Sequence, residues 1–185
     1  MRKLILAMFV SADGYIEGPN GELAPPAWSD DLDTHWSKAN LDRAGAVLYG
    51  RVCYEMMSSY WQSPAADAQV AKRLADSPKY LCSTTLSKVN WTNTSIIRGD
   101  IPAEIAALKT QPGKDVVCFG GAGIASSLLK WQLVDDMRLM VTPSLLGGGK
   151  LLFNGNYPRS ALRLISARPM DTGAVILHYA FNRPQ

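Results

Sequence analysis

The chain has few histidines and cysteines and no long apolar run. Its two histidines, His35 and His178, lie far apart, without Cys or carboxylate neighbours at metal-ligand spacing, so no metal site is expected. The three cysteines, Cys53, Cys82 and Cys118, are odd in number and lie in predicted buried segments, which favours reduced thiols in a cytoplasm over disulfides. No stretch approaches the ~18–20 apolar residues of a transmembrane helix.

Clusters of basic residues and the common nucleotide or hydrolase motifs are also missing. The net charge of +3 is modest and no Lys/Arg run occurs, so neither a nucleic acid nor a membrane is expected as a partner. No G-x-S-x-G elbow is present, and Lys150 after glycines 147–149 lacks the P-loop spacing. Residues 121–126 lack the third glycine of a Rossmann fingerprint and follow a late strand. With 185 residues, 47% of them hydrophobic, the chain is predicted to form a single globular domain, residues 1–185.

Apolar segments alternate with helical patterns along most of the chain. Helices are expected to begin near Ser29, Arg51, Ala65, Pro102 and Gly123. Up to about Trp131 helices separate the strands, and beyond it they do not. This order predicts an α/β fold with a mainly parallel central sheet, helices on both faces and an antiparallel C-terminal hairpin. The predicted strands are Leu4–Val10, Ala46–Tyr49, Tyr80–Ser83, Ser95–Arg98, Val116–Phe119, Met137–Val141, Leu162–Ala167 and Val175–Ala180.

Two of these strands run into glycine and then into a helix, at Ala46–Glu55 and at Asp115–Ile124. A glycine there lets the backbone approach a ligand, and the helix behind it offers unpaired N–H groups to an anion. Two such junctions in one domain suit a ligand with more than one phosphate. The alternative is that both glycines form only tight strand-to-helix turns.

Six segments in order give the chain a family resemblance. It resembles the dihydrofolate reductase superfamily, within it the branch that contains the reductase domain of bacterial riboflavin-biosynthesis proteins. The resemblance implies a three-layer dihydrofolate reductase-like fold and an NADPH-dependent reductase acting on a pterin-like or ribosylaminopyrimidine-like heterocycle. The alternative is a nucleotide-binding module whose catalysis is lost or altered, because Cys53 stands where the family commonly has threonine. The six segments are residues 11–16, 48–55, 78–85, 119–123, 133–136 and 142–153.

The resemblance also implies which residues bind the cofactor. Ser83 and Thr84 would meet the adenosine ribose and its 2′-phosphate, with Arg51 as the charge partner; a strand end with turn-forming hydroxyls is the alternative for this pair. The Gly120–Gly121 bond is cis in relatives, and we hypothesise the same geometry here. The full implied set is Phe9, Ile16, Gly50, Arg51, Val52, Cys53, Ser83, Thr84, Gly120, Gly121, Ala122, Gly123 and Ile124.

The substrate end is predicted from carboxylates and aromatic residues. Trp28, Asp33 and Trp36 reproduce the tryptophan–acid–tryptophan spacing of bacterial dihydrofolate reductases, which makes Asp33 the candidate anchor and proton carrier for a heterocycle. An acidic helix start is the alternative for Asp33. Asp13 is the second candidate acid, although Asp-Gly is also a common tight turn.

Four aromatic residues could form the walls of a flat-ring pocket, or pack in the core. They are Trp28, Trp36, Tyr54 and Trp61. Relatives often pair through the C-terminal part of the sheet, so a homodimer through residues 139–141 and 175–177 is also expected.

Overall fold

One sheet of eight strands organises the computed structural model, which describes residues 1–155 and 157–182. The strand order is β5-β4-β3-β6-β1-β7-β10-β9. The first six strands of this order, from β5 across to β7, are all parallel to one another. Strand β10 is antiparallel to both of its neighbours, β7 and β9. The predicted α/β class, the parallel sheet and the C-terminal hairpin are therefore confirmed. The strands are β1 (Leu4–Ser11), β3 (Ala44–Gly50), β4 (Lys79–Cys82), β5 (Thr94–Ile97), β6 (Asp115–Cys118), β7 (Asp136–Thr142), β9 (Leu162–Pro169) and β10 (Val175–Phe181).

A small antiparallel ribbon was not predicted from the sequence. It pairs β2 (Tyr15–Glu17) with β8 (Lys150–Leu151). Each strand is only two or three residues long, too short for a hydrophobic period to show.

The helices begin close to the predicted positions, except that the one expected near Ala65 begins at Ala68, where Asp67 caps it. The first helical segment changes geometry along its length, because a π-helix lies between its two α-helical ends. The helices are α1 (Asp30–Leu32), η1 (Asp33–Lys38, the π-helix), α2 (Ala39–Arg43), α3 (Arg51–Trp61), α4 (Ala68–Asp76), α5 (Ile101–Thr110) and α6 (Ala122–Lys130).

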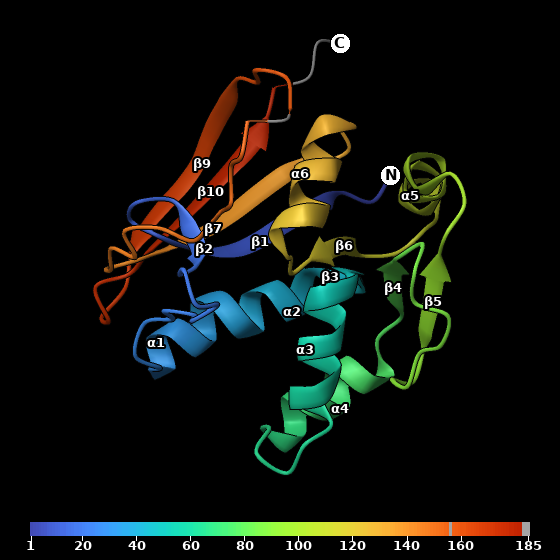
Figure 1. Cartoon of the computed structure of the whole chain (residues 1–185), viewed down its shortest axis with the longest axis horizontal. Helices are drawn as coiled ribbons and strands as arrows, with labels where there is room; N and C mark the ends of the chain where they lie inside the picture. The colour runs from blue at the N-terminus through green and yellow to red at the C-terminus, as the bar shows by residue number, and fades with distance from the viewer. Residues whose placement is uncertain (156, 183–185) are drawn as a thin grey trace.

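Helices cover both faces of the sheet and make three layers. Side chains of α5 and α6, such as Ile105 and Leu128, pack on one face with Leu4, Leu6 and Leu48. The other face is covered by η1 through Trp36, by α2 through Leu41, and by α3 and α4. Figure 1 shows α1 to α4 on one side of the sheet and α5 and α6 on the other. Among the described residues, none of the helices has the length and apolar character that a membrane crossing requires.

Candidate functional site

The carboxyl ends of six parallel strands meet at one edge of the sheet. These ends are Ser11, Gly50, Cys82, Ile97, Cys118 and Thr142, and most of the predicted site residues follow directly after them. In an open α/β sheet this is the edge where ligands bind. The topology therefore brings together segments from the whole length of the chain.

The two predicted glycine junctions lie next to each other at this edge. The Gly50 backbone N–H donates to the Gly120 carbonyl at 3.2 Å. A Cβ added to Gly50 would lie 3.1 Å from the Ile124 side chain, so the end of β3 and the start of α6 are in close contact and a larger residue would push Ile124 aside. The starts of α3 and α6 are thus neighbours.

Neither of these two helix starts is capped by a side chain, in contrast to the starts of α1, α4 and α5. Gly50 and Gly121 are the N-caps of α3 and α6, and neither receives a side-chain hydrogen bond. Ser29, Asp67 and Asp100 do cap α1, α4 and α5. A Cβ added to Gly121 or Gly123 would meet nothing within 4 Å, so the space before α6 is open. Polar N–H groups that face open space can receive an anion.

The loop between β6 and α6 is held by close backbone packing. Gly120 has a φ of +109°, a conformation that strains any residue with a side chain, and an added Cβ would lie 2.7 Å from the Met8 sulfur, which would have to shift. The Gly120–Gly121 peptide bond is cis, as hypothesised. The Cys53 thiol donates to the Phe119 carbonyl at 3.5 Å, and burial raises its pKa to about 12. The Cys53 side chain thus packs under this loop, which leaves its backbone N–H, and not its thiol, for a phosphate.

The residues predicted for the adenosine end divide into exposed and internally bonded groups. The guanidinium of Arg51 is half-exposed and lies 3.1 Å from the Glu55 carboxylate. Thr84 is exposed, but Ser83 is buried, and its hydroxyl accepts hydrogen bonds from the Leu86 and Thr85 backbone at 3.0 and 3.3 Å. For Ser83 the turn-forming alternative therefore describes the side chain, and its hydroxyl is already engaged.

Sequence reasoning missed a basic residue at this end of the site. Arg98 follows β5 directly, and its guanidinium donates to the Leu86 carbonyl. The loop that begins at Ser83 therefore lies between two exposed arginines, Arg51 and Arg98. The available signal was the position of Arg98 at the carboxyl end of a predicted parallel strand, where a positive charge faces the ligand edge.

At the substrate end, Asp33 lies on the π-helix and pairs with Lys38. Its carboxylate is 2.7 Å from the Lys38 ammonium, and its side chain is 25% exposed. This pair, five residues apart, closes across a π-helical turn, since a wider turn brings such residues to one face. The hydrogen bond and charge of Asp33 raise the pKa of Lys38 above its usual value. The Asp33 carboxylate therefore lies partly exposed at the predicted position.

The four predicted aromatic residues do not share one pocket. Trp28 is 59% exposed, and Trp36 is buried with its ring centroid 5.3 Å from that of Phe9. Tyr54 is 2% exposed, and its hydroxyl accepts a hydrogen bond from the Trp91 backbone at 3.2 Å, which places it in the core. Trp61 ends α3, about 15 Å along the helix from its start. For Tyr54 the core-packing alternative therefore describes the side chain, and α3 carries Trp61 away from the strand ends.

Asp13 holds a neighbouring loop. Its carboxylate accepts hydrogen bonds from the Ser11 hydroxyl at 2.6 Å and from the Gly147 and Leu146 backbone at 2.8 and 3.1 Å. These bonds, that of Ser11 first, lower the pKa of Asp13 below its usual value. A carboxylate with this environment stays ionised, which argues against Asp13 as a proton donor.

Phe9 and Ile16 line a narrow crevice of about 20 Å³ at the ends of β1 and β7. A crevice of this volume is far too small for an aromatic ring, so an inserted ring requires the neighbouring side chains to move. Residues 23–25 form one wall and belong to a segment without regular structure. The full lining is Phe9, Val10, Ser11, Tyr15, Ile16, Leu23, Ala24, Pro25, Thr142 and Leu146.

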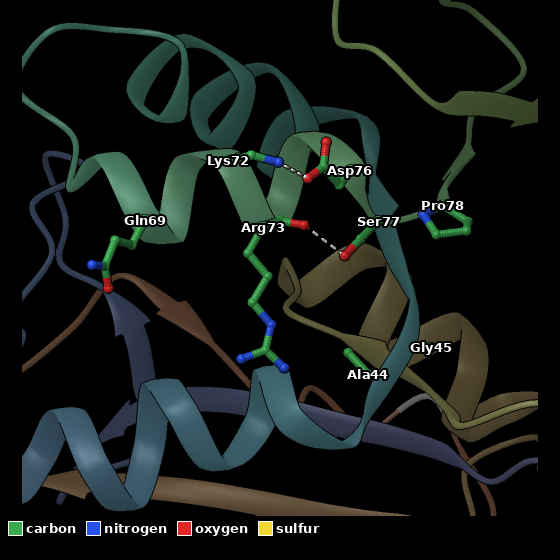
Figure 2. Close-up of a pocket in the computed structure, with 8 residues that line it drawn as sticks. All are labelled: Ala44, Gly45, Gln69, Lys72, Arg73, Asp76, Ser77 and Pro78. Atoms are coloured by element: carbon green, nitrogen blue, oxygen red, sulfur yellow. Dashed lines mark hydrogen bonds and ion pairs between the residues drawn. The ribbon is translucent and has the colours of Figure 1, made fainter.

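A larger groove of about 560 Å³ lies at the opposite edge of the sheet, where β3 and β4 begin (Figure 2). Its charged side chains are already paired, Lys72 with Asp76 at 2.5 Å and Arg73 with Asp42 at 2.8 Å. Because it lies at the opposite edge, the groove is separate from the candidate site.

In the part of the chain that the structure describes, no group of three or more His, Cys, Asp or Glu side chains is placed to hold a metal ion.

Together the fold and this edge define the class of protein, an α/β domain with the architecture of dihydrofolate reductases. The chain belongs to the RibD C-terminal domain family, whose model matches residues 2–176. It is 31% identical to "Uncharacterized protein YyaP" of Bacillus subtilis, over 98% of this chain and 96% of that protein.

Solved structures share the fold. A "Putative riboflavin biosynthesis protein" from Shewanella sp. PV-4 superposes with a TM-score of 0.80 at 22% identity, covering 98% of this chain and 99% of the other. A dihydrofolate reductase from Enterococcus faecalis, solved with NADP(H), superposes with a TM-score of 0.66 at 14% identity, covering 98% and 97%.

Proposed function

We propose that the protein is an NADPH-dependent reductase that transfers a hydride to a nitrogen heterocycle of the pterin or ribosylaminopyrimidine type. The observation that carries this proposal is the pair of adjacent helix starts at Gly50 and Gly121, which lack side-chain caps, with open space before α6. The family and the dihydrofolate reductase-like fold support a reductase.

Each part of the dinucleotide has a matching group at this edge. The N–H groups of Arg51, Val52 and Cys53 on α3, and of Ala122, Gly123 and Ile124 on α6, would receive the pyrophosphate. Arg51, Arg98 and Thr84 would bind the adenosine 2′-phosphate, because guanidinium groups form strong charge-assisted bonds to phosphate. Gly120, Phe9 and Ile16 would border the nicotinamide. When bound, NADPH would supply the hydride.

Asp33 would serve the substrate. Its partly exposed carboxylate can accept hydrogen bonds from two N–H groups on one edge of a heterocycle and return a proton after reduction. Lys38 compensates its charge, and Trp28 offers an exposed aromatic face nearby in the chain. The protein would thus orient the two reactants and supply the proton.

Nucleotide binding without catalysis is the second candidate. Two observations favour it: the buried Cys53 thiol replaces a donor hydroxyl, and the crevice beside Phe9 is too narrow for a ring. Turnover separates the two candidates.

The decisive experiment titrates NADPH and NADH and then follows cofactor oxidation with a panel of pterins and pyrimidines. We expect NADPH to bind more tightly than NADH, and the preference to fall about tenfold in Arg51→Gln or Arg98→Gln. Lys72→Gln, at the opposite edge of the sheet, is the matched control and should change neither the Kd for NADPH nor the Kd for NADH. Equal affinity of the wild type for both cofactors would remove the 2′-phosphate assignment, and binding without any oxidation would favour the second candidate.

We also propose that the protein forms a homodimer through the edge of its sheet. Strand β9 is exposed along its whole length at the edge of the sheet, including Leu164 at 52% and Ile165 at 44%. An open apolar edge strand favours pairing with another copy. Sedimentation should therefore show a dimer that Leu164→Lys dissociates, and a monomeric wild type would contradict this.

A further inference from the structure

Helix α3 begins with a cation, where a negative charge is the favourable one. Arg51 is its first residue and its first turn contains no acidic residue, whereas α1 begins with Asp30 and Asp31, and α5 has Glu104 in its first turn. Because the N-terminal end of a helix carries a partial positive charge, a guanidinium group at this end is unfavourable on its own. An anion beside Arg51 is therefore stabilising.

In the structure this anion is the carboxylate of Glu55, one turn further along the same helix. The Nη1 atom of Arg51 lies 3.1 Å from one carboxylate oxygen of Glu55 and 3.4 Å from the other. The two side chains are 48% and 45% exposed, and such pairs contribute little to stability. The basic residue also precedes the acidic one, which is the less favourable order in a helix. The pair is thus a weak one that an anion from solution can replace.

The second arginine at this end of the site has a neutral partner. The Arg98 guanidinium donates to the Leu86 backbone carbonyl, which carries no net charge. A phosphate can therefore bind Arg98 without displacing an anion. At Arg51 the phosphate has to displace the Glu55 carboxylate or lie beside it, and like charges repel.

Accordingly, we propose that Glu55 is a specificity-determining residue that lowers the preference for NADPH over NADH, because its carboxylate competes with the adenosine 2′-phosphate for Arg51. NADH has a hydroxyl group in place of this phosphate, so it has no charge with which to displace Glu55. The role of Glu55 rests on the proposed reductase function and on the assignment of Arg51 to the 2′-phosphate.

Calorimetric titration of Glu55→Gln with NADPH and with NADH tests this role, since glutamine keeps the size of the side chain and removes its charge. We expect the Kd for NADPH to fall by about three- to fivefold, the size of an exposed ion pair, and the Kd for NADH to change by less than about twofold. Adenosine 2′,5′-bisphosphate and adenosine 5′-phosphate should show the same difference. Asp76→Asn removes the similarly spaced pair with Lys72 at the opposite edge of the sheet, and this control should change neither Kd.

Two double variants show whether Glu55 acts through Arg51. The gain in NADPH affinity should disappear when Glu55→Gln is combined with Arg51→Gln, and it should persist with Arg98→Gln. An unchanged or weaker NADPH affinity in Glu55→Gln would overturn the proposal, and so would a gain that survives in Arg51→Gln. Both outcomes leave the reductase function standing. A wild type that binds neither cofactor would instead refute the reductase function, and the role of Glu55 with it.

Discussion

Substitution of Gly123 by aspartate separates cofactor binding from stability. Gly123 lies in the first turn of α6, and an added Cβ meets nothing within 4 Å, so the fold accommodates the side chain. Glycine is a poor helix residue, and a carboxylate in the first turn interacts favourably with the helix dipole. The free energy of unfolding should therefore stay level or rise by roughly 0.5–1.5 kcal/mol.

The same carboxylate should weaken NADPH binding strongly. At roughly 6 Å and an effective dielectric constant of about 40, two like unit charges repel by ~1.4 kcal/mol. A pyrophosphate with about two charges then loses roughly 2–3 kcal/mol, which corresponds to about 30–150-fold in Kd. Calorimetric titration measures this loss, and urea unfolding measures the stability of the same samples.

Two control variants sharpen the result. Gly123→Ala adds the Cβ without the charge and should change Kd by less than about threefold. Ala68→Asp adds a carboxylate to the first turn of α4, away from the site, and should leave Kd unchanged. If Gly123→Asp binds NADPH as tightly as the wild type, the cofactor does not lie over the start of α6.

Three further predictions concern single residues. Asp33→Asn should lower kcat by about 10²–10⁴-fold with an unchanged Kd for NADPH, because only proton transfer to the substrate is lost; an unaltered kcat would remove Asp33 from the mechanism. Hydrogen bonds lower the pKa of Asp13 in the fold, so its contribution to stability is present above the ordinary value of 3.8 and disappears as the pH falls through the lower folded value. Asp13→Asn should thus differ from the wild type in urea unfolding at pH 6 and approach it near pH 3. Burial lowers the pKa of Lys79 from 10.5 to about 8, so with rising pH the folded protein loses this proton before the unfolded chain does. The free energy of unfolding of the wild type, compared with that of Lys79→Met, should therefore rise between pH 8 and pH 10.5, by at most about 3 kcal/mol. A difference that falls or stays flat would show that Lys79 keeps its proton in the fold.

The apolar runs, the helix-capping residues and the glycines of the sequence predicted the fold well. Continuous apolar runs such as Leu4–Val10 marked the buried strands, and caps such as Asp100 marked helix starts, because both depend on residues adjacent in the chain. The two glycine junctions were also visible, since a strand, a glycine and a helix follow one another directly. The ribbon of β2 and β8 was missed because its strands are too short to have a period.

The individual roles of side chains were less predictable. Tyr54 and Trp61 belong to a helix that starts at the site, but only the packing of α3 decides that Tyr54 faces Trp91 in the core. The engagement of the Ser83 hydroxyl and the position of Arg98 beside the Leu86 carbonyl depend on how β4 and β5 place their following loops.

The sequence by itself determined the order of strands and helices, the class of the fold and the glycines where two helices begin. These properties follow from local periodicity, capping and backbone freedom, which neighbouring residues decide. The tertiary structure alone decided that the starts of α3 and α6 are neighbours and that Arg168 of β9 pairs with Asp31 of α1. Both depend on segments far apart in the chain that only the assembled sheet brings together.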